Sequence, residues 1–324
     1  MPTIAPLDLP GHCVFAGFIA NTPLFADASG SIHRIEGGEK VAQVHDGLLC
    51  ATVNLDGSRL ITGGEDGKII ASAANGEAKE LAANPKKWIT SIATGPNGTI
   101  AFASGKITSL IDANGKRVDH THERSIEGVA LAPKGIRLAS ARYNGVTLSF
   151  PGTAAKPSEL EWKGAHNGVC FSPDGRYVVT TMQENALHGW RLEDGKHMRM
   201  TGYPAKIKSW SWSAKGRHLA TSGAEAAIVW PFHGKDGPMG KAPLELGTRA
   251  TLKVTAVACH PLEEVCAVGF SDGMILAVRF ADSKEVLLRR GGKGALSSMN
   301  WDSGGFRLAY GSETGDCGVI DIAG

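Results

Sequence analysis

The stretch GVCFSPDGRYVVTTMQENALHGW, residues 168–190, decides the fold of this 324-residue chain. It reads as a short apolar strand, a turn built on Pro and Gly, a second strand, a small polar turn and a third strand that ends in Trp190. Weaker copies are LLCATVNLDGSRLITGGEDGKIIAS at 48–72, IEGVALAPKGIRLASARYNGVTLSF at 126–150 and KSWSWSAKGRHLATSGAEAAIVW at 208–230. A period of about 40 residues with several strands per repeat is typical of a radial array of small sheets, in which each repeat buries its faces against its neighbours.

The turn between the first and second strands recurs eight times, so the sequence predicts eight repeats. At these places Pro, Asn, Asp or Gly supplies the backbone angles that a tight turn between antiparallel strands needs. The turns lie at residues 21–23, 55–57, 96–98, 133–135, 173–175, 214–216, 261–263 and 303–305. A second hairpin turn follows, for example at Asp66-Gly67 and Asn144-Gly145, and then a more polar fourth strand, for example at 196–201 and 284–290.

The last repeat lacks a fourth strand, because it ends at Gly324. Residues 3–9 alternate weakly between apolar and polar and belong to no repeat. We therefore expect them to supply the outer strand of the last repeat, which would close a ring of sheets and remove an exposed sheet edge.

Composition favours one domain over residues 1–324. Hydrophobic residues make up 42% of the chain and occur in short runs, none long enough to cross a membrane, and no linker divides them. The first residues lack the basic start and apolar run of a secretory signal, and a net charge of +2 gives no reason to expect nucleic acid as a partner. The six cysteines occur singly, so we expect reduced, buried thiols in a cytoplasmic protein rather than a redox or metal site.

The Ser-Pro-Asp-Gly-Arg turn at 172–176, followed by a third strand that ends in Trp190, resembles the signature of the WD-repeat (WD40) β-propeller family. The resemblance covers nearly the whole chain: Trp230 ends another third strand, and residues 111–112 and 320–321 read Ile-Asp. In the family a His, a Ser or Thr, an Asp and the Trp form a hydrogen-bonded set within a blade, and no repeat here clearly retains all four. The resemblance implies an all-β propeller of four-stranded antiparallel blades and a divergent, prokaryotic-type member. We favour eight blades, with seven as the alternative.

No catalytic motif stands out in the sequence. There is no GxSxG elbow, no HExxH, no GxxxxGK[ST] phosphate loop and no paired CxxC. We interpret the adjacent Cys259 and His260 as a buried thiol beside a turn residue rather than as half of a metal site. We therefore expect no enzyme activity, cofactor or metal. The predicted function is a scaffold that binds a protein or peptide on the rim of the propeller. The alternative is a small-ligand-binding or enzymatic propeller that uses its central channel.

The loops before the first strands, which form the upper rim in the family, carry basic residues in most repeats. Acidic residues of the second turns, such as Glu65 and Glu313, are expected on the same side. The rim is therefore either an ordinary solvated surface or a patch for an acidic partner.

Two residues of this rim stand out from their neighbours. Trp88 follows two lysines and is either an anchor for a partner or a packing residue. His166 opens a first strand where the other repeats have an apolar residue, and it is either hydrogen-bonded to a neighbouring strand or a contact residue. The predicted partner-binding residues are Lys86, Lys87, Trp88, Arg124, His166, Lys206 and Lys208.

Overall fold

Short antiparallel strands joined by tight turns make up almost all of the structure, a computed structural model that describes residues 6–35 and 38–323. The predicted all-β class is confirmed. The chain divides into two compact units. Unit 1 comprises residues 1–28, 32–41 and 203–324, and unit 2 comprises residues 29–31 and 42–202.

Unit 1 contains four antiparallel sheets of four strands each. The first consists of β2 (Cys13–Ile19), β3 (Thr22–Asp27), β4 (Ser31–Ile35) and β5 (Glu39–Gln43). The next two consist of β20 (Trp210–Trp212), β21 (His218–Thr221), β22 (Ala227–Pro231) and β23 (Leu244–Leu246), and of β24 (Val254–Cys259), β25 (Val265–Phe270), β26 (Ile275–Arg279) and β27 (Glu285–Arg289). The last has the order β28 (Leu296–Trp301), β29 (Arg307–Ser312), β30 (Asp316–Asp321) and β1 (Leu7–Asp8).

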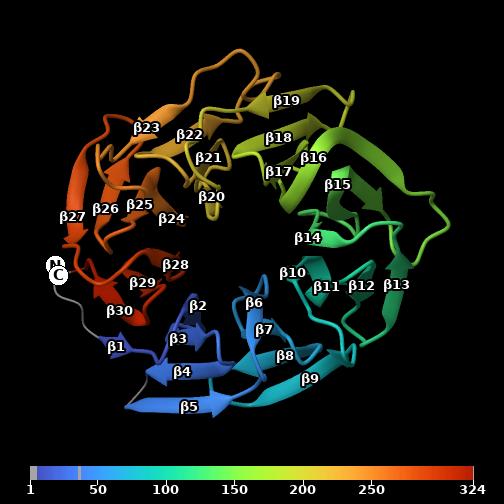
Figure 1. The fold of residues 1–324 in the computed structure, drawn as a ribbon, viewed down its shortest axis with the longest axis horizontal. Coiled ribbons are helices and arrows are strands. Elements are labelled where there is room, and N and C mark those ends of the chain that lie inside the picture. The colour runs from blue at the N-terminus through green and yellow to red at the C-terminus, as the bar shows by residue number, and fades with distance from the viewer. Residues whose placement is uncertain (1–5, 36–37, 324) are drawn as a thin grey trace. The chain divides into compact units, whose positions relative to one another are not determined.

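Unit 2 contains two four-stranded sheets and one six-stranded sheet. The four-stranded sheets consist of β6 (Leu48–Val53), β7 (Arg59–Gly64), β8 (Lys68–Ala73) and β9 (Ala78–Ala83), and of β10 (Ser91–Thr94), β11 (Ile100–Ser104), β12 (Ile107–Ile111) and β13 (Arg117–Thr121). The six-stranded sheet consists of β14 (Ile126–Leu131), β15 (Leu138–Ser149), β16 (Ser158–Phe171), β17 (Tyr177–Met182), β18 (Ala186–Arg191) and β19 (His197–Met200). Figure 1 shows β10 and β14 of this unit as neighbours, with β13 at the far edge of its sheet.

The described residues form seven hydrogen-bonded sheets, so the favoured number of eight separate blades is wrong. The reason is β16, which runs without a break from Ser158 to Phe171. Its first half pairs with β15 and its second half with β17. The fourth strand of one repeat and the first strand of the next are therefore one strand, and two repeats share the six-stranded sheet.

The N-terminal strand pairs with the last strand of the chain, as predicted. Leu7 lies opposite Cys317 and Asp8 opposite Asp316, so β1 is the outer strand beside β30. Leu7 and Leu9 are buried there. Residues 3–5 of the predicted strand lie outside the described residues. The closure of a ring by this pairing stays a prediction.

Apolar side chains fill the space between neighbouring sheets of a unit. In unit 2, Ile61 of β7 and Phe102 of β11 belong to one buried cluster, and Leu110 of β12 and Leu138 of β15 belong to the next. Serine hydroxyls of first strands add hydrogen bonds between sheets, because Ser91 Oγ accepts from Val129 N at 3.1 Å. No sheet buries both faces by itself, which is the physical reason for the repeat.

None of the six cysteines forms a disulfide in the described residues. Cys13, Cys266 and Cys317 are buried, and the other three are half-buried. Burial raises the pKa of Cys50 to about 12, so its thiolate, the reactive form, is scarce at neutral pH. These thiols act as small apolar groups in the packing, as the sequence predicted.

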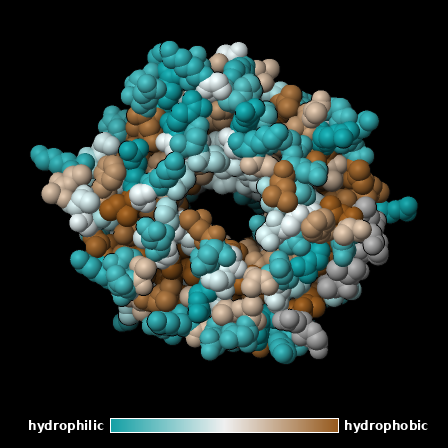
Figure 2. Space-filling view, turned by 180° about the vertical axis from the view of Figure 1, so that it is seen from behind, coloured by the Kyte–Doolittle hydropathy of each residue, from teal (hydrophilic) through white to brown (hydrophobic). Residues whose placement is uncertain are grey.

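The helical content of the described residues is a single turn, Pro96–Gly98, which is far too short to span a bilayer. On the face seen in Figure 2, hydrophilic residues predominate and hydrophobic residues gather in separate groups. Such a surface can contain small apolar contact sites. The candidates for these sites lie at the loop edges of the sheets.

Candidate functional site

The loop that carries Lys86, Lys87 and Trp88 is held by backbone hydrogen bonds at both ends. Lys87 N donates to Asn84 O at 3.1 Å, and Lys86 has a φ of +65°, as expected at the third position of a type II turn that begins at Asn84. Ile89 N donates to Gly64 O at 3.0 Å. Trp88 lies between these two anchors with 57% of its surface exposed. More than half of the Trp88 surface is therefore open to solvent, and the rest contacts the protein.

The loop before β14 repeats this arrangement in the next sheet. His122 N donates to Lys106 O at 2.8 Å, and Ile126 N donates to Gly105 O at 2.9 Å. Between these bonds Arg124 projects, with its guanidinium 5.3 Å from the ring centre of Tyr143, a cation–π contact. Tyr143 is 52% exposed.

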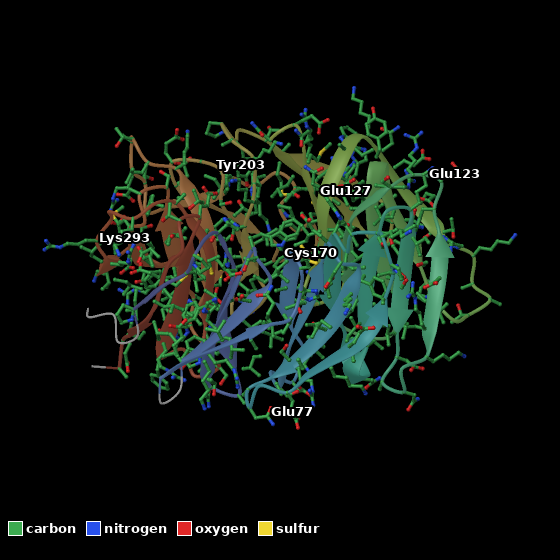
Figure 3. The ribbon with its side chains drawn as sticks, turned by 60° about the horizontal axis from the view of Figure 1, so that its bottom comes forward. Glu77, Glu123, Glu127, Cys170, Tyr203 and Lys293 are labelled. Atoms are coloured by element: carbon green, nitrogen blue, oxygen red, sulfur yellow. The ribbon has the colours of Figure 1, made fainter. Side chains whose placement is uncertain are left out.

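The loops before the first strands and the second turns lie at one edge of unit 2. The bonds from Ile89 to Gly64 and from Ile126 to Gly105 join the two kinds of loop directly. Figure 3 shows Glu123 and Glu127 at this edge and Glu77 at the opposite edge. The expectation that basic and acidic loops share one side is therefore confirmed in unit 2.

Three adjoining pockets hollow this edge of unit 2. The Trp88 pocket, of about 580 Å³, is lined by Lys87, Trp88, Lys106, Ile107 and Ile126 among others. The Tyr143 pocket, of about 490 Å³, shares Lys106 and Glu127 with it and adds Arg124, Tyr143 and His166. The third, which we call the polar cavity, has about 660 Å³ and shares Arg124 with the Tyr143 pocket. Four predicted site residues, Lys87, Trp88, Arg124 and His166, thus line this group of pockets.

His166 is fully buried, unlike the other predicted site residues. Its Nδ1 lies 2.7 Å from Thr180 Oγ1, and its Nε2 lies 3.0 Å from Trp162 O. Burial lowers its pKa from the ordinary histidine value. Both ring nitrogens are engaged within the fold, as the hydrogen-bonded alternative requires.

Arg142, which lines the polar cavity, pairs with Glu159. Four other basic residues of this edge in unit 2 have no ion pair with any carboxylate in the described residues. They are Lys86, Lys87, Lys106 and Arg124, all exposed. In unit 1, Lys206 and Lys208 are also exposed, but Lys208 Nζ lies 3.2 Å from Glu313 Oε1.

Sequence reasoning missed a hydrogen-bonded set in the repeat that begins at Leu48. His45 Nδ1 lies 3.0 Å from Asp66 Oδ1, and His45 Nε2 lies 2.8 Å from Thr62 Oγ1. The signal was present in the sequence as a His shortly before the first strand and an Asp in the second turn. These three residues match three of the four members of the WD-repeat set, with the Trp missing.

A variant of this set occurs in unit 1. Tyr203 replaces the histidine: its hydroxyl lies 2.7 Å from Thr221 Oγ1 and accepts a hydrogen bond from Trp230 Nε1 at 2.6 Å. A search of the sequence for the histidine of the WD-repeat set would miss this variant, because a tyrosine takes its place.

The described residues contain no group of three or more His, Cys, Asp or Glu side chains arranged to hold a metal ion. His260 stabilises the turn in which it lies. Its Nδ1 accepts hydrogen bonds from Leu262 N and Glu263 N, and its Nε2 lies 3.0 Å from Gly305 O. The interpretation of His260 as a turn residue is thus confirmed.

Comparison of sequences relates one segment of the chain to a known protein. No protein-family model matches the chain. A segment of 80 residues is 31% identical to WD repeat-containing protein 1-B of Xenopus laevis. This segment is 24% of the chain and spans only 13% of the length of that relative.

Three solved structures match between 84% and 99% of the chain. It is similar to the computationally designed Ika8 protein, with a TM-score of 0.78 and 17% identity over 97% of this chain and 98% of that one. It is similar to a chain of the Mitotic Checkpoint Complex, with a TM-score of 0.67 and 12% identity over 99% and 95%. It is also similar to the β-propeller domain of Cps50 (Swd1) from Myceliophteria thermophila, with a TM-score of 0.68 and 17% identity over 84% and 96%. The four-stranded antiparallel sheets and these likenesses to solved structures show a β-propeller fold, and the 80-residue segment is similar to part of a WD repeat-containing protein.

Proposed function

We propose that this protein is a non-catalytic, cytoplasmic interaction scaffold whose single domain binds a protein or peptide at the loop edge of unit 2. The observation that carries the proposal is the pair of exposed aromatic residues, Trp88 and Tyr143, each beside its own pocket. Trp and Tyr, with Arg, are the residue types most enriched among interface hot spots.

The Trp88 pocket offers the apolar part of the contact. Ile107 and Ile126 line it together with the indole of Trp88. Two backbone hydrogen bonds fix the loop, so binding an apolar side chain there would cost little ordering of the protein. We infer that a partner inserts one apolar side chain between Trp88 and these isoleucines.

Basic groups near the pocket support an acidic character of the partner. Lys87, Lys106 and Arg124 have no carboxylate partner of their own in the described residues, whereas Glu123 and Glu127 supply two negative charges at the same edge. The small positive excess speeds the approach of an acidic segment more than it tightens the final complex. Lys206 and Lys208 form a second basic surface, in unit 1, and His166 supports the edge from within.

Likeness to solved structures gives general support to protein binding. One of the similar chains belongs to the Mitotic Checkpoint Complex. Fold alone does not supply a partner, so the proposal for this chain rests on the loop edge of unit 2.

The test starts with a partner identified by affinity purification of the tagged protein from its native cells. Trp88→Ala should then weaken binding by about 2 kcal/mol or more, roughly thirtyfold in the dissociation constant. Phe306→Ala is the matched control, because Phe306 is 59% exposed but lies in unit 1. Both variants must melt like the parent. Equal affinity of the Trp88 variant and the parent would refute this binding surface.

A further inference from the structure

The proposed protein contact uses Glu123 and Arg124 at the border of the polar cavity, but not the cavity itself. The cavity lies between β13 and the first half of β16, and it is bordered by Asn144, where the pairing of β15 with β16 changes register. Its volume of about 660 Å³ is within the range of about 300 to 1,000 Å³ that is usual for small-molecule sites. The chemistry of its lining therefore indicates what it could bind.

A fixed polar framework lines the cavity. Arg142 Nε donates to Thr147 Oγ1 at 3.1 Å, and Arg142 Nη1 donates to Tyr143 O at 3.0 Å. Arg142 Nη2 donates to Glu159, and Thr147 Oγ1 donates to the same carboxylate at 2.8 Å. Thr147 is only 3% exposed. The guanidinium and the carboxylate are thus held in place before any ligand arrives.

His122 supplies a polar nitrogen to this framework from within the fold. The residue is 7% exposed, and its Nε2 lies 2.9 Å from Thr108 Oγ1. The ring of His120 packs edge-on against it, with the ring centres 4.5 Å apart. Nδ1 of His122 makes no hydrogen bond to another residue in the part of the chain that the structure describes. This nitrogen is open to solvent, and a polar ligand could take the place of water there.

The charges around the cavity cancel. Arg142 and Glu159 neutralise each other, and the two remaining cations, Arg124 and Lys163, are matched by two carboxylates, Glu123 and Glu161. A site for phosphate or carboxylate would need an excess of positive charge. The balance favours a ligand that is neutral overall.

The lining offers both hydrogen-bond donors and acceptors, together with one aromatic residue. Asn144 Oδ1 already accepts from Gly164 N, which leaves the amide NH₂ to donate, while Glu161 can only accept. Trp162 lines the same cavity, and its ring stacks on His188 with the ring centres 4.2 Å apart, so the indole is held rigidly. A hydroxyl both donates and accepts, and the C–H face of a sugar ring packs well on an indole.

We propose that the polar cavity binds a neutral carbohydrate, with Asn144, Glu161 and Lys163 bonding its hydroxyls and Trp162 lying against a sugar ring. This site does not depend on the protein-binding function. It is also separate from any use of a central channel, since its lining comes from β13, β15, β16 and the loop before β14.

The test exposes the full-length protein to an array of neutral oligosaccharides of two to four hexose or N-acetylhexosamine units, and then titrates the ones retained. Inorganic phosphate and an acidic peptide serve as comparison probes. We expect at least one neutral oligosaccharide to bind and to change the tryptophan fluorescence. Glu161→Gln and Asn144→Gly should each weaken that binding at least tenfold. The second variant keeps a residue that tolerates the φ of +65° at this position.

Trp88→Ala is the control, because Trp88 lines a different pocket and should leave sugar binding unchanged. Conversely, Glu161→Gln should leave the protein partner bound, so the two proposals can fail separately. Binding of phosphate but no sugar would show an anion site instead. Binding of the peptide alone would make the cavity part of the docking surface, and retention of none of these probes would refute the carbohydrate site.

Discussion

The loop edges of the two units differ in what their basic residues contact. In unit 1, Lys208 pairs with Glu313, Lys253 with Glu225 and Lys293 with Asp8. In unit 2, Lys86, Lys87 and Arg124 have no such partner in the described residues, and two exposed aromatic rings lie beside them. Exposed ion pairs contribute only about 0–1 kcal/mol to stability, so the difference concerns the charge left for a partner. Loops at equivalent positions of a repeat can thus carry paired basic residues in one unit and unpaired basic residues in the other, and the proposed contact uses the unpaired ones.

Acid should destabilise unit 2 more than unit 1, and this is the largest difference that we expect between the units. Burial lowers the pKa of His188 to about 3 and that of His122 to about 4, and both lie in unit 2. The folded protein keeps these rings neutral, whereas the unfolded chain takes up protons near pH 6.5. The free energy of unfolding should therefore fall between pH 6.5 and pH 4, by up to about 1.4 kcal/mol per pH unit for each ring. Hydrogen exchange in β17 and β18 should accelerate before exchange in β25 and β26.

Replacement of His188 tests the cause of this acid sensitivity. Both of its ring nitrogens are buried without a hydrogen bond, and Trp162 and Trp190 pack against the ring. His188→Phe fills a similar space without a titrating group, so the variant should lose less stability between pH 6.5 and pH 4 than the parent. Unit 1 has one described histidine with a lowered pKa, the half-buried His218, where Glu264 opposes the shift. An equal loss of stability in parent and variant would remove His188 as the cause.

Loss of the N-terminal strand should affect unit 1 alone. Deletion of residues 2–9 removes the buried Leu7 and Leu9 and leaves β30 as an unpaired edge. Burial of one leucine contributes about 1.5–3 kcal/mol, so Tm should fall by several degrees and self-association should increase. Differential scanning fluorimetry, together with hydrogen exchange in β29 and β30, measures this effect. A truncated protein that stays monomeric with an unchanged Tm would contradict it.

Charge reversal should distinguish paired from unpaired lysines. Lys87→Glu should slow association with an acidic partner several-fold at low salt, and the effect should shrink as salt screens the charges. Lys208→Glu is the matched control, because Glu313 already neutralises much of the Lys208 charge. Stopped-flow association rates at two salt concentrations give the comparison. If the two variants slow binding equally, the ion pair with Glu313 does not reduce the contribution of Lys208 to the association rate.

The smallest effect concerns the backbone of the Trp88 loop. Lys86 has a φ of +65°, which costs a non-glycine residue roughly 1 kcal/mol, whereas the loop before β28 in unit 1 places Gly292 and Gly294 at positive φ. Lys86→Gly should therefore raise the free energy of unfolding by up to about 1 kcal/mol, as measured by denaturant titration. A loss of stability would mean that the lysine side chain contributes packing that outweighs the strain.

Local signals in the sequence account for the parts that were predicted correctly. The turns at 55–57, 133–135 and 173–175 contain the Gly residues that their positive φ requires, and strand alternation fixes which side chains face the neighbouring sheet. The N-terminal strand was predictable because an unpaired edge strand at the end of a repeat is costly. The place of Trp88 beside two lysines can also be read directly from the chain, and its role in binding stays a prediction.

Tertiary structure decided what depends on distant residues. The partner of Lys208 lies 105 residues away, and the polar cavity combines side chains from three strands and a loop, so no local pattern reports either. The structure has seven sheets rather than eight because β16 continues through the boundary between two repeats. The period of the repeats predicts a break between two strands at that point. The sequence by itself determined the repeat, its turns and its buried faces, since these follow from local backbone preferences and a period of two residues. Folding decided which charges are paired and where cavities form, because Coulomb interactions and packing act between residues that only the fold brings together.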